Sequence, residues 1–180
     1  MAVRRYFLGA NTGKGFVSVY EDFCRPESGN FLYVNKGGPG CGKSSFMKKI
    51  GKAAEEAGLD VEYVLCSGDP DSLDGVLVPA WHVGYADGTS PHVLDVALPA
   101  ASGAYLDLGQ FYDVPALRPK REALADLTEK YRAQYAIAYA ALAQAKKLHD
   151  ELEAIYNPHV DFDGVYALAR QHILQHQAEN

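Results

Sequence analysis

The sequence has few cysteines, no long hydrophobic run and no block of basic residues. Its three cysteines, Cys24, Cys41 and Cys66, have neither the number nor the spacing of a disulfide framework or a zinc site. No segment approaches the roughly 18 consecutive apolar residues of a membrane span, and no signal-peptide core follows the first residues. A reducing cytoplasm is therefore the expected location, with no membrane as a partner.

The overall composition predicts one folded domain that does not bind nucleic acid. The chain has 180 residues, of which 48% are hydrophobic, so it can bury a core of its own. Its net charge is −6, and a protein that binds DNA or RNA needs a basic surface.

A glycine-rich motif of the form G-x-x-x-x-G-K-[ST] is the most informative feature. It consists of Gly37, Gly38, Pro39, Gly40, Cys41, Gly42, Lys43 and Ser44. An apolar, strand-like run at 31–35 precedes it, and a helical pattern at 44–57 follows it. Strand, loop and helix in this order are the context in which such a motif binds phosphate.

The motif predicts a site for a nucleoside triphosphate and Mg²⁺. Glycines allow successive backbone N–H groups to converge on an anion, and the helix adds its positive end. Lys43 is expected to contact the β- and γ-phosphates, and the Ser44 hydroxyl to bind Mg²⁺. By resemblance to P-loop proteins in general, Ser45 is expected beside the α-phosphate. No guanine-binding signature occurs, which favours ATP.

Aspartates follow two predicted strands and are candidates for chemistry. The strand 61–65 leads into the loop 66–75, where Asp69 either orients water or accepts a proton, or serves only as a turn residue. The strand 81–86 ends at Asp87, the first choice for a Walker B carboxylate that holds Mg²⁺, with Asp95 as the second choice. No glutamate follows Asp87, so fast intrinsic hydrolysis is not expected. His92 could contact a ligand, although a structural role is favoured.

The remaining pattern predicts an α/β fold followed by helices. Residues 1–116 are expected to form a P-loop NTPase core: a mostly parallel sheet between two helical layers, with the strand before the motif at its centre. Segments 5–8 and 16–20 are expected to pair as an edge hairpin. Residues 117–180 predict a helical hairpin, with helices at about 120–156 and 162–177, whose projecting end needs a second subunit or a second P-loop half.

Several segments resemble an uncharacterised bacterial family of tandem P-loop ATP-binding proteins. They are the glycine-rich motif, the runs at 67–75 and 87–92, and the opening run at 7–16. The resemblance implies ATP binding. Because members of this family carry a second P-loop half after a helical region, it also implies that this chain corresponds to the N-terminal half.

Two reactions remain open from the sequence. In the first, Lys43, Ser44 and Asp87 hold ATP and Mg²⁺ for slow hydrolysis, while Asp69 or Asp71 orients water. In the second, the protein is a small-molecule, nucleoside or nucleotide kinase with Asp69 as the base. A nucleotide-binding module without turnover is a third alternative.

Overall fold

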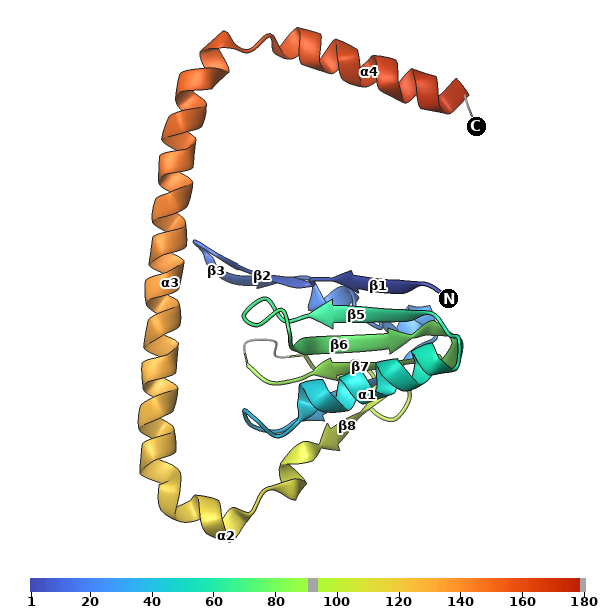
Figure 1. Ribbon diagram of the computed structural model, residues 1–180, viewed down its shortest axis with the longest axis vertical. Coiled ribbons are helices and arrows are strands. Elements are labelled where there is room, and N and C mark those ends of the chain that lie inside the picture. The colour runs from blue at the N-terminus through green and yellow to red at the C-terminus, as the bar shows by residue number, and fades with distance from the viewer. Residues whose placement is uncertain (91–93, 179–180) are drawn as a thin grey trace.

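The computed structural model describes residues 1–90 and 94–178, and its central element is a six-stranded sheet (Figure 1). In spatial order the strands are β1 (Val3–Tyr6), β5 (Val61–Leu65), β6 (Leu73–Val78), β7 (Val83–Asp87), β4 (Phe31–Lys36) and β8 (Gly103–Asp107). All of them point in one direction except β6, which is antiparallel to both of its neighbours. The chain is therefore an α/β protein with a mostly parallel sheet.

The parallel strands bring distant loops together. Because β4, β5, β7 and β8 end on the same side, the segments that follow them meet at what we call the carboxyl edge of the sheet. In open α/β sheets this edge is where ligands bind. The glycine-rich loop 37–42 lies there, directly after β4 and before α1 (Lys43–Glu56).

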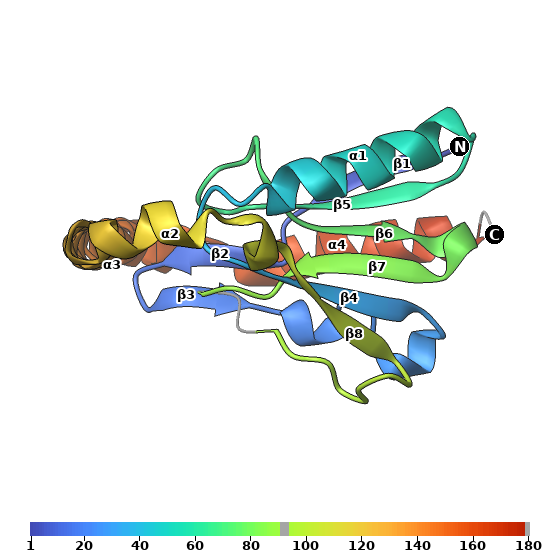
Figure 2. The same ribbon diagram turned by 90° about the horizontal axis from the view of Figure 1, so that it is seen from below.

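The two faces of the sheet are covered in different ways (Figure 2). On one face α1 packs Met47 and Ala54 against strand residues such as Val76. On the other face, the 3₁₀ turn η1 (Tyr20–Asp22), residues 23–24 after it and the segment 94–96 cover the strands. A second 3₁₀ turn, η2 (Pro26–Ser28), leads from there to β4. The expected helices on both faces are wrong for the described part of the chain, because Tyr20, Phe23 and Leu94 fill this face without a helix.

The strand before the glycine-rich loop is not central. β4 is the fifth of six strands, with only β8 outside it. The cause is α1, which passes over β6 and β7 before the chain enters the sheet again as β5. The antiparallel return through β6 and β7 then fills the space between β5 and β4.

Two further expectations about strands are wrong. The hairpin forms between β2 (Gly9–Thr12) and β3 (Gly15–Ser18), while β1 joins the main sheet beside β5. A two-residue turn becomes possible there because the Thr12 hydroxyl binds the backbone of residues 14 and 15. The expected loop 66–75 ends at residue 72, since β6 begins at Leu73 with strand partners on both sides.

A helical arm, residues 114–178, follows the sheet. The 3₁₀ turn η3 (Pro79–Trp81) connects β6 to β7, and the 3₁₀ turn η4 (Leu108–Phe111) follows β8. The arm then consists of α2 (Val114–Leu117), η5 (Arg118–Lys120), α3 (Arg121–Tyr156), η6 (Asn157–His159) and α4 (Phe162–Ala178). The two long helices fall where the sequence predicts them. They do not form a hairpin, because α4 turns away from α3 instead of packing along it (Figure 1).

The long helix α3 runs alongside the carboxyl edge, on the side toward which the parallel strands point (Figure 1). The Tyr139 hydroxyl donates to Asn11 Oδ1 at 3.2 Å, and the Asn11 amide donates to the Ser67 carbonyl. Gly13 lies against the backbone of Ala143. Apart from these contacts at β2 and the loop after β5, α3 stands free of the sheet. Among its residues only Tyr135 and Tyr139 are partly buried, and all others are exposed.

Within the described ranges, the helices do not combine the length and hydrophobicity that crossing a bilayer requires.

Candidate functional site

The glycine-rich loop adopts a backbone that residues with a side chain rarely take. Gly37, Gly40 and Gly42 have φ values of 148°, 74° and 91°, all in the left-handed half of conformational space. A β-carbon at Gly37 would lie 2.6 Å from Cys41 Sγ, so the loop is also too tight for one. These glycines therefore fix the path of the chain between β4 and α1.

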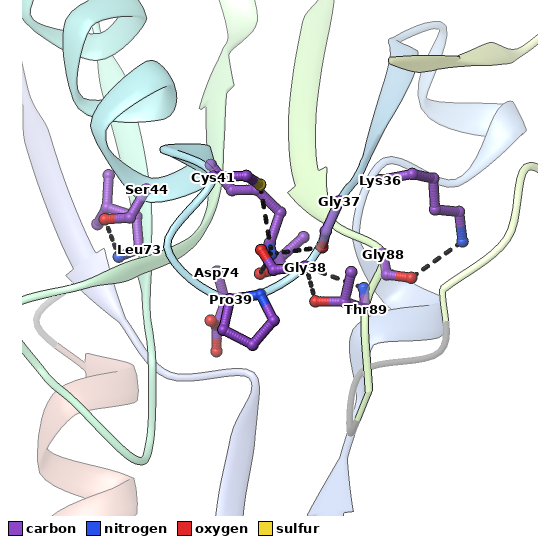
Figure 3. A network of polar contacts seen from close by, with 12 residues as sticks. Lys36, Gly37, Gly38, Pro39, Cys41, Ser44, Leu73, Asp74, Gly88 and Thr89 are labelled. Carbon is purple, nitrogen blue, oxygen red and sulfur yellow. Dashed lines mark hydrogen bonds and ion pairs between the residues drawn. The ribbon is translucent and has the colours of Figure 1, made fainter. Parts of the chain in front are cut away.

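Figure 3 shows the loop at Gly37, Gly38 and Cys41, and the Lys43 side chain folds back onto these three residues. Its ammonium group donates to the carbonyls of Gly37 at 2.9 Å and Gly38 at 3.1 Å, and lies 3.9 Å from Cys41 Sγ. Only 8% of the residue is exposed. A buried ammonium needs acceptors or a counter-ion, and here it has both carbonyls and a carboxylate.

That carboxylate belongs to Asp87, at the end of β7. Asp87 Oδ2 lies 3.6 Å from Lys43 Nζ. Its other oxygen accepts hydrogen bonds from the Thr89 backbone N–H at 2.8 Å and hydroxyl at 2.5 Å. The turn after β7 thus fixes the orientation of Asp87, and the first-choice acid of the sequence lies beside the lysine of the motif.

The first turn of α1 presents free backbone N–H groups. The first backbone bond of the helix runs from Phe46 N–H to the Gly42 carbonyl, so the N–H groups of Lys43, Ser44 and Ser45 have no acceptor within the helix. No side chain of the described residues caps this end, and no acid lies in the first turn. An uncapped helix end that follows a nest-like loop has the properties of an anion site.

Oxygen ligands suitable for Mg²⁺ lie at the start of α1 and at the end of β7. Ser44 Oγ accepts the Leu73 backbone N–H of β6 at 2.9 Å, and Asp87 is at the end of the neighbouring β7. A hydroxyl and a carboxylate suit the oxygen preference of Mg²⁺, which usually keeps several waters. The donor chemistry of these residues therefore fits this ion.

Asp69 is engaged within its own turn. Its side chain accepts from the Ser72 hydroxyl at 2.6 Å and from the Asp71 backbone N–H at 3.3 Å. Ser72 N–H also donates to the Asp69 carbonyl, which closes the turn between β5 and β6. This is the turn role that the sequence left open, and a catalytic role of Asp69 remains a prediction.

Asp95, the second-choice acid, lies elsewhere. It accepts a hydrogen bond from the Tyr105 hydroxyl of β8, and this bond lowers the pKa of the exposed carboxyl group. Its neighbours Leu94 and Val96 pack on the face of the sheet opposite α1. Asp95 is thus separated from Lys43, while His92 lies outside the described residues.

Three residues near the loop had no individual role assigned from the sequence. The Tyr112 hydroxyl donates to the Pro39 carbonyl at 3.0 Å, which places the segment after β8 against the loop. Asp74 is buried on β6 and accepts from the Tyr20 hydroxyl at 2.9 Å. Asn35 is buried on β4. A polar residue just before the motif was the one signal available for Asn35; Tyr112 and Asp74 required the fold.

Comparison of the chain with protein-family models, with curated proteins and with solved structures found no match.

Proposed function

We propose that the protein binds a nucleoside triphosphate, most simply ATP, together with Mg²⁺ at the glycine-rich loop. The observation that carries this proposal is the buried Lys43 ammonium, held by two loop carbonyls beside Asp87. A lysine in this position can exchange carbonyl acceptors for phosphate oxygens without crossing open solvent. The glycine backbone and the uncapped end of α1 support the same ligand.

The roles of the residues follow from their chemistry. Lys43 would neutralise the terminal phosphates, while the first N–H groups of α1, including that of Ser45, would bind phosphate oxygens. Ser44 and Asp87 would hold Mg²⁺, which when bound neutralises charge on the transferred phosphoryl group. Thr89 would keep the Asp87 carboxylate oriented.

Slow hydrolysis, coupled to a partner, is the reaction that we propose. Gly88 stands after Asp87, where many ATPases carry a glutamate that activates water. A transition-state arginine from a partner can add about 10³–10⁵ in rate to an enzyme of this type. The kinase alternative gains no support from Asp69, whose side chain is engaged in its turn. Membership in the tandem P-loop family likewise remains a proposal.

The helical arm is the proposed surface for that partner. It exposes large apolar side chains along both long helices, among them Leu127, Ile137, Ile155, Val165 and Ile173. The partner is either another copy of this chain or a second P-loop half. A monomer at every concentration in light scattering would leave only the second of these.

The experiment that tests the function is calorimetric titration of ATP with Mg²⁺. Lys43→Ala should weaken binding by at least about tenfold, because a charge-assisted phosphate contact contributes roughly 1.5–3 kcal/mol. Lys52→Ala is the matched control, since this exposed lysine on the same helix pairs only with Glu56 among the described residues. Equal affinity in both variants and the wild type would refute the proposal.

A second measurement separates the reactions. Phosphate release by the wild type with Mg²⁺, lost in Lys43→Ala, would establish hydrolysis. ADP formation only after addition of a pool of nucleosides and small metabolites would establish a kinase instead. Binding without either product would mean that turnover depends on a partner.

A further inference from the structure

Asn35 is a fully buried polar side chain that the fold does not use. Its exposed fraction is 0%, and neither its amide nitrogen nor its carbonyl oxygen has a hydrogen-bond partner among the described residues. A buried carboxamide that remains unpaired is destabilising, because the loss of its hydrogen bonds to water is not compensated. Such a group in a native protein calls for an explanation, and ordered water or a functional role is the usual one.

The register of the sheet places Asn35 beside the proposed metal site. Asn35 of β4 pairs with Asp87 of β7, so both side chains lie on the same face. That face is the one covered by α1, because two residues earlier Tyr33 stacks on Tyr85 with ring centres 5.0 Å apart, and Phe46 of α1 packs against Tyr85.

Three polar side chains therefore follow neighbouring strands on the face of the sheet that α1 covers. Ser44 is bound over β6 at Leu73, Asp87 ends β7, and Asn35 lies near the end of β4. Asn35 lies on the strand next to that of the proposed metal ligand Asp87, and adjacent strands are about 4.8 Å apart. An ion bound to Asp87 would therefore be separated from the Asn35 side chain by about the width of one water. This arrangement suits a residue that acts through water and does not touch the metal.

We propose that Asn35 is a positioning residue: its carboxamide holds a water in the outer coordination shell of Mg²⁺ next to Asp87. This inference rests on the proposed function. A carboxamide can donate to a carboxylate and accept from water at the same time, which an apolar residue cannot. Outer-shell partners of this kind typically change metal affinity by about 10–100-fold.

The inference makes two opposite predictions for one variant, Asn35→Leu. Removing an unpaired buried group should leave the melting temperature of the nucleotide-free protein unchanged or raise it. The same change should reduce the ratio of ATP affinity with Mg²⁺ to ATP affinity without Mg²⁺ by roughly tenfold. A purely structural asparagine would lower the melting temperature and leave this ratio unchanged.

Two further variants complete the test. Asn35→Ala is smaller than the native residue, so it cannot overpack the site, and its affinity ratio should fall as that of Asn35→Leu does. Asn30→Leu, the same change at the opposite end of the strand, should leave the ratio unaltered, because Asn30 binds only Ser28 among the described residues.

The outcomes are separable from those of the proposed function. If the wild type binds ATP and loses it in Lys43→Ala, but both Asn35 variants keep the full Mg²⁺ dependence, the inference fails and the function stands. If both Asn35 variants fail to fold, the side chain is structural and the inference fails as well. A wild type without ATP binding overturns both.

Discussion

The sheet and the helical arm are held in shape by different means. The sheet buries Val34, Val61, Val64, Val76 and Val78 completely, and its strands lie next to partners that are distant in sequence. The arm has no fully buried residue among those described, and its hydrogen bonds are mainly those within its own helices. The sheet is therefore specified by tertiary packing, whereas the arm is specified locally and displays its apolar residues outward.

The largest test of this contrast is truncation of one apolar side chain in each region. Met47→Ala in α1 should lower the free energy of unfolding by about 2–5 kcal/mol, because the side chain is fully buried. Leu148→Ala in α3 should change it by no more than about 0.5 kcal/mol, because Leu148 is 57% exposed. Urea denaturation followed by circular dichroism measures both.

An equal cost for the two variants would break the contrast. It would mean that the arm is covered in solution, and a melting temperature that rises with protein concentration would identify a second copy as the cover.

A smaller effect is expected where the two regions touch. A β-carbon at Gly13 would lie 2.6 Å from Ala143 Cα, a backbone atom that cannot move aside by a change of rotamer. Gly13→Ala should therefore displace α3 from the hairpin and increase hydrogen exchange around residues 135–143. Lys14→Ala, in the same turn, is the control. Unchanged exchange in Gly13→Ala would show that this contact does not hold the arm.

The last test concerns thiol chemistry, which leaves the structure unchanged and needs no substitution. Burial raises the pKa of the Cys24 thiol to about 12, so near pH 8 it holds roughly a thousandfold less thiolate than an ordinary thiol. Cys41 and Cys66, half-buried at the carboxyl edge, should react with iodoacetamide first, as mass spectrometry of the labelled peptides would show. Because the raised pKa favours the neutral form, Cys24 should gain reactivity only toward strongly alkaline pH.

ATP with Mg²⁺ sharpens this last comparison. It should slow labelling of Cys41 in the glycine-rich loop more than labelling of Cys66, which lies after β5. Equal protection of the two thiols would contradict binding at the loop.

The sequence was most informative where structure is local. The helices at 121–156 and 162–178 and the strands at 31–36 and 61–65 follow from periodicity and from breakers such as Pro158. Lys43 was chosen because it belongs to the glycine-rich motif, and Asp87 because it ends a predicted strand. The structure places their charged groups 3.6 Å apart.

What the sequence could not give depends on contacts between distant segments. β6 contains Asp74 and Gly75, both poor strand formers, yet Asp74 is satisfied by Tyr20 and Gly75 leaves room for Val64. Likewise, the position of β4 depends on how far α1 carries the chain across the sheet. The direction of α4 is set by the turn at 157–161. The sequence shows that the helix is interrupted there, but it does not give the angle between α3 and α4.

Because α3 is long, the small contact at Tyr139 could act as a pivot for the rest of the helix. From Tyr139 to Tyr156 the helix extends for about 25 Å at 1.5 Å per residue, and α4 begins beyond it. A tilt of about 10° at this fulcrum would move the far end of α3 by about 4 Å, simply by the geometry of a rigid rod. Tyr139 is connected to the loop after β5 through Asn11. A small displacement of that loop at the carboxyl edge would therefore become a larger displacement at the far end of α3.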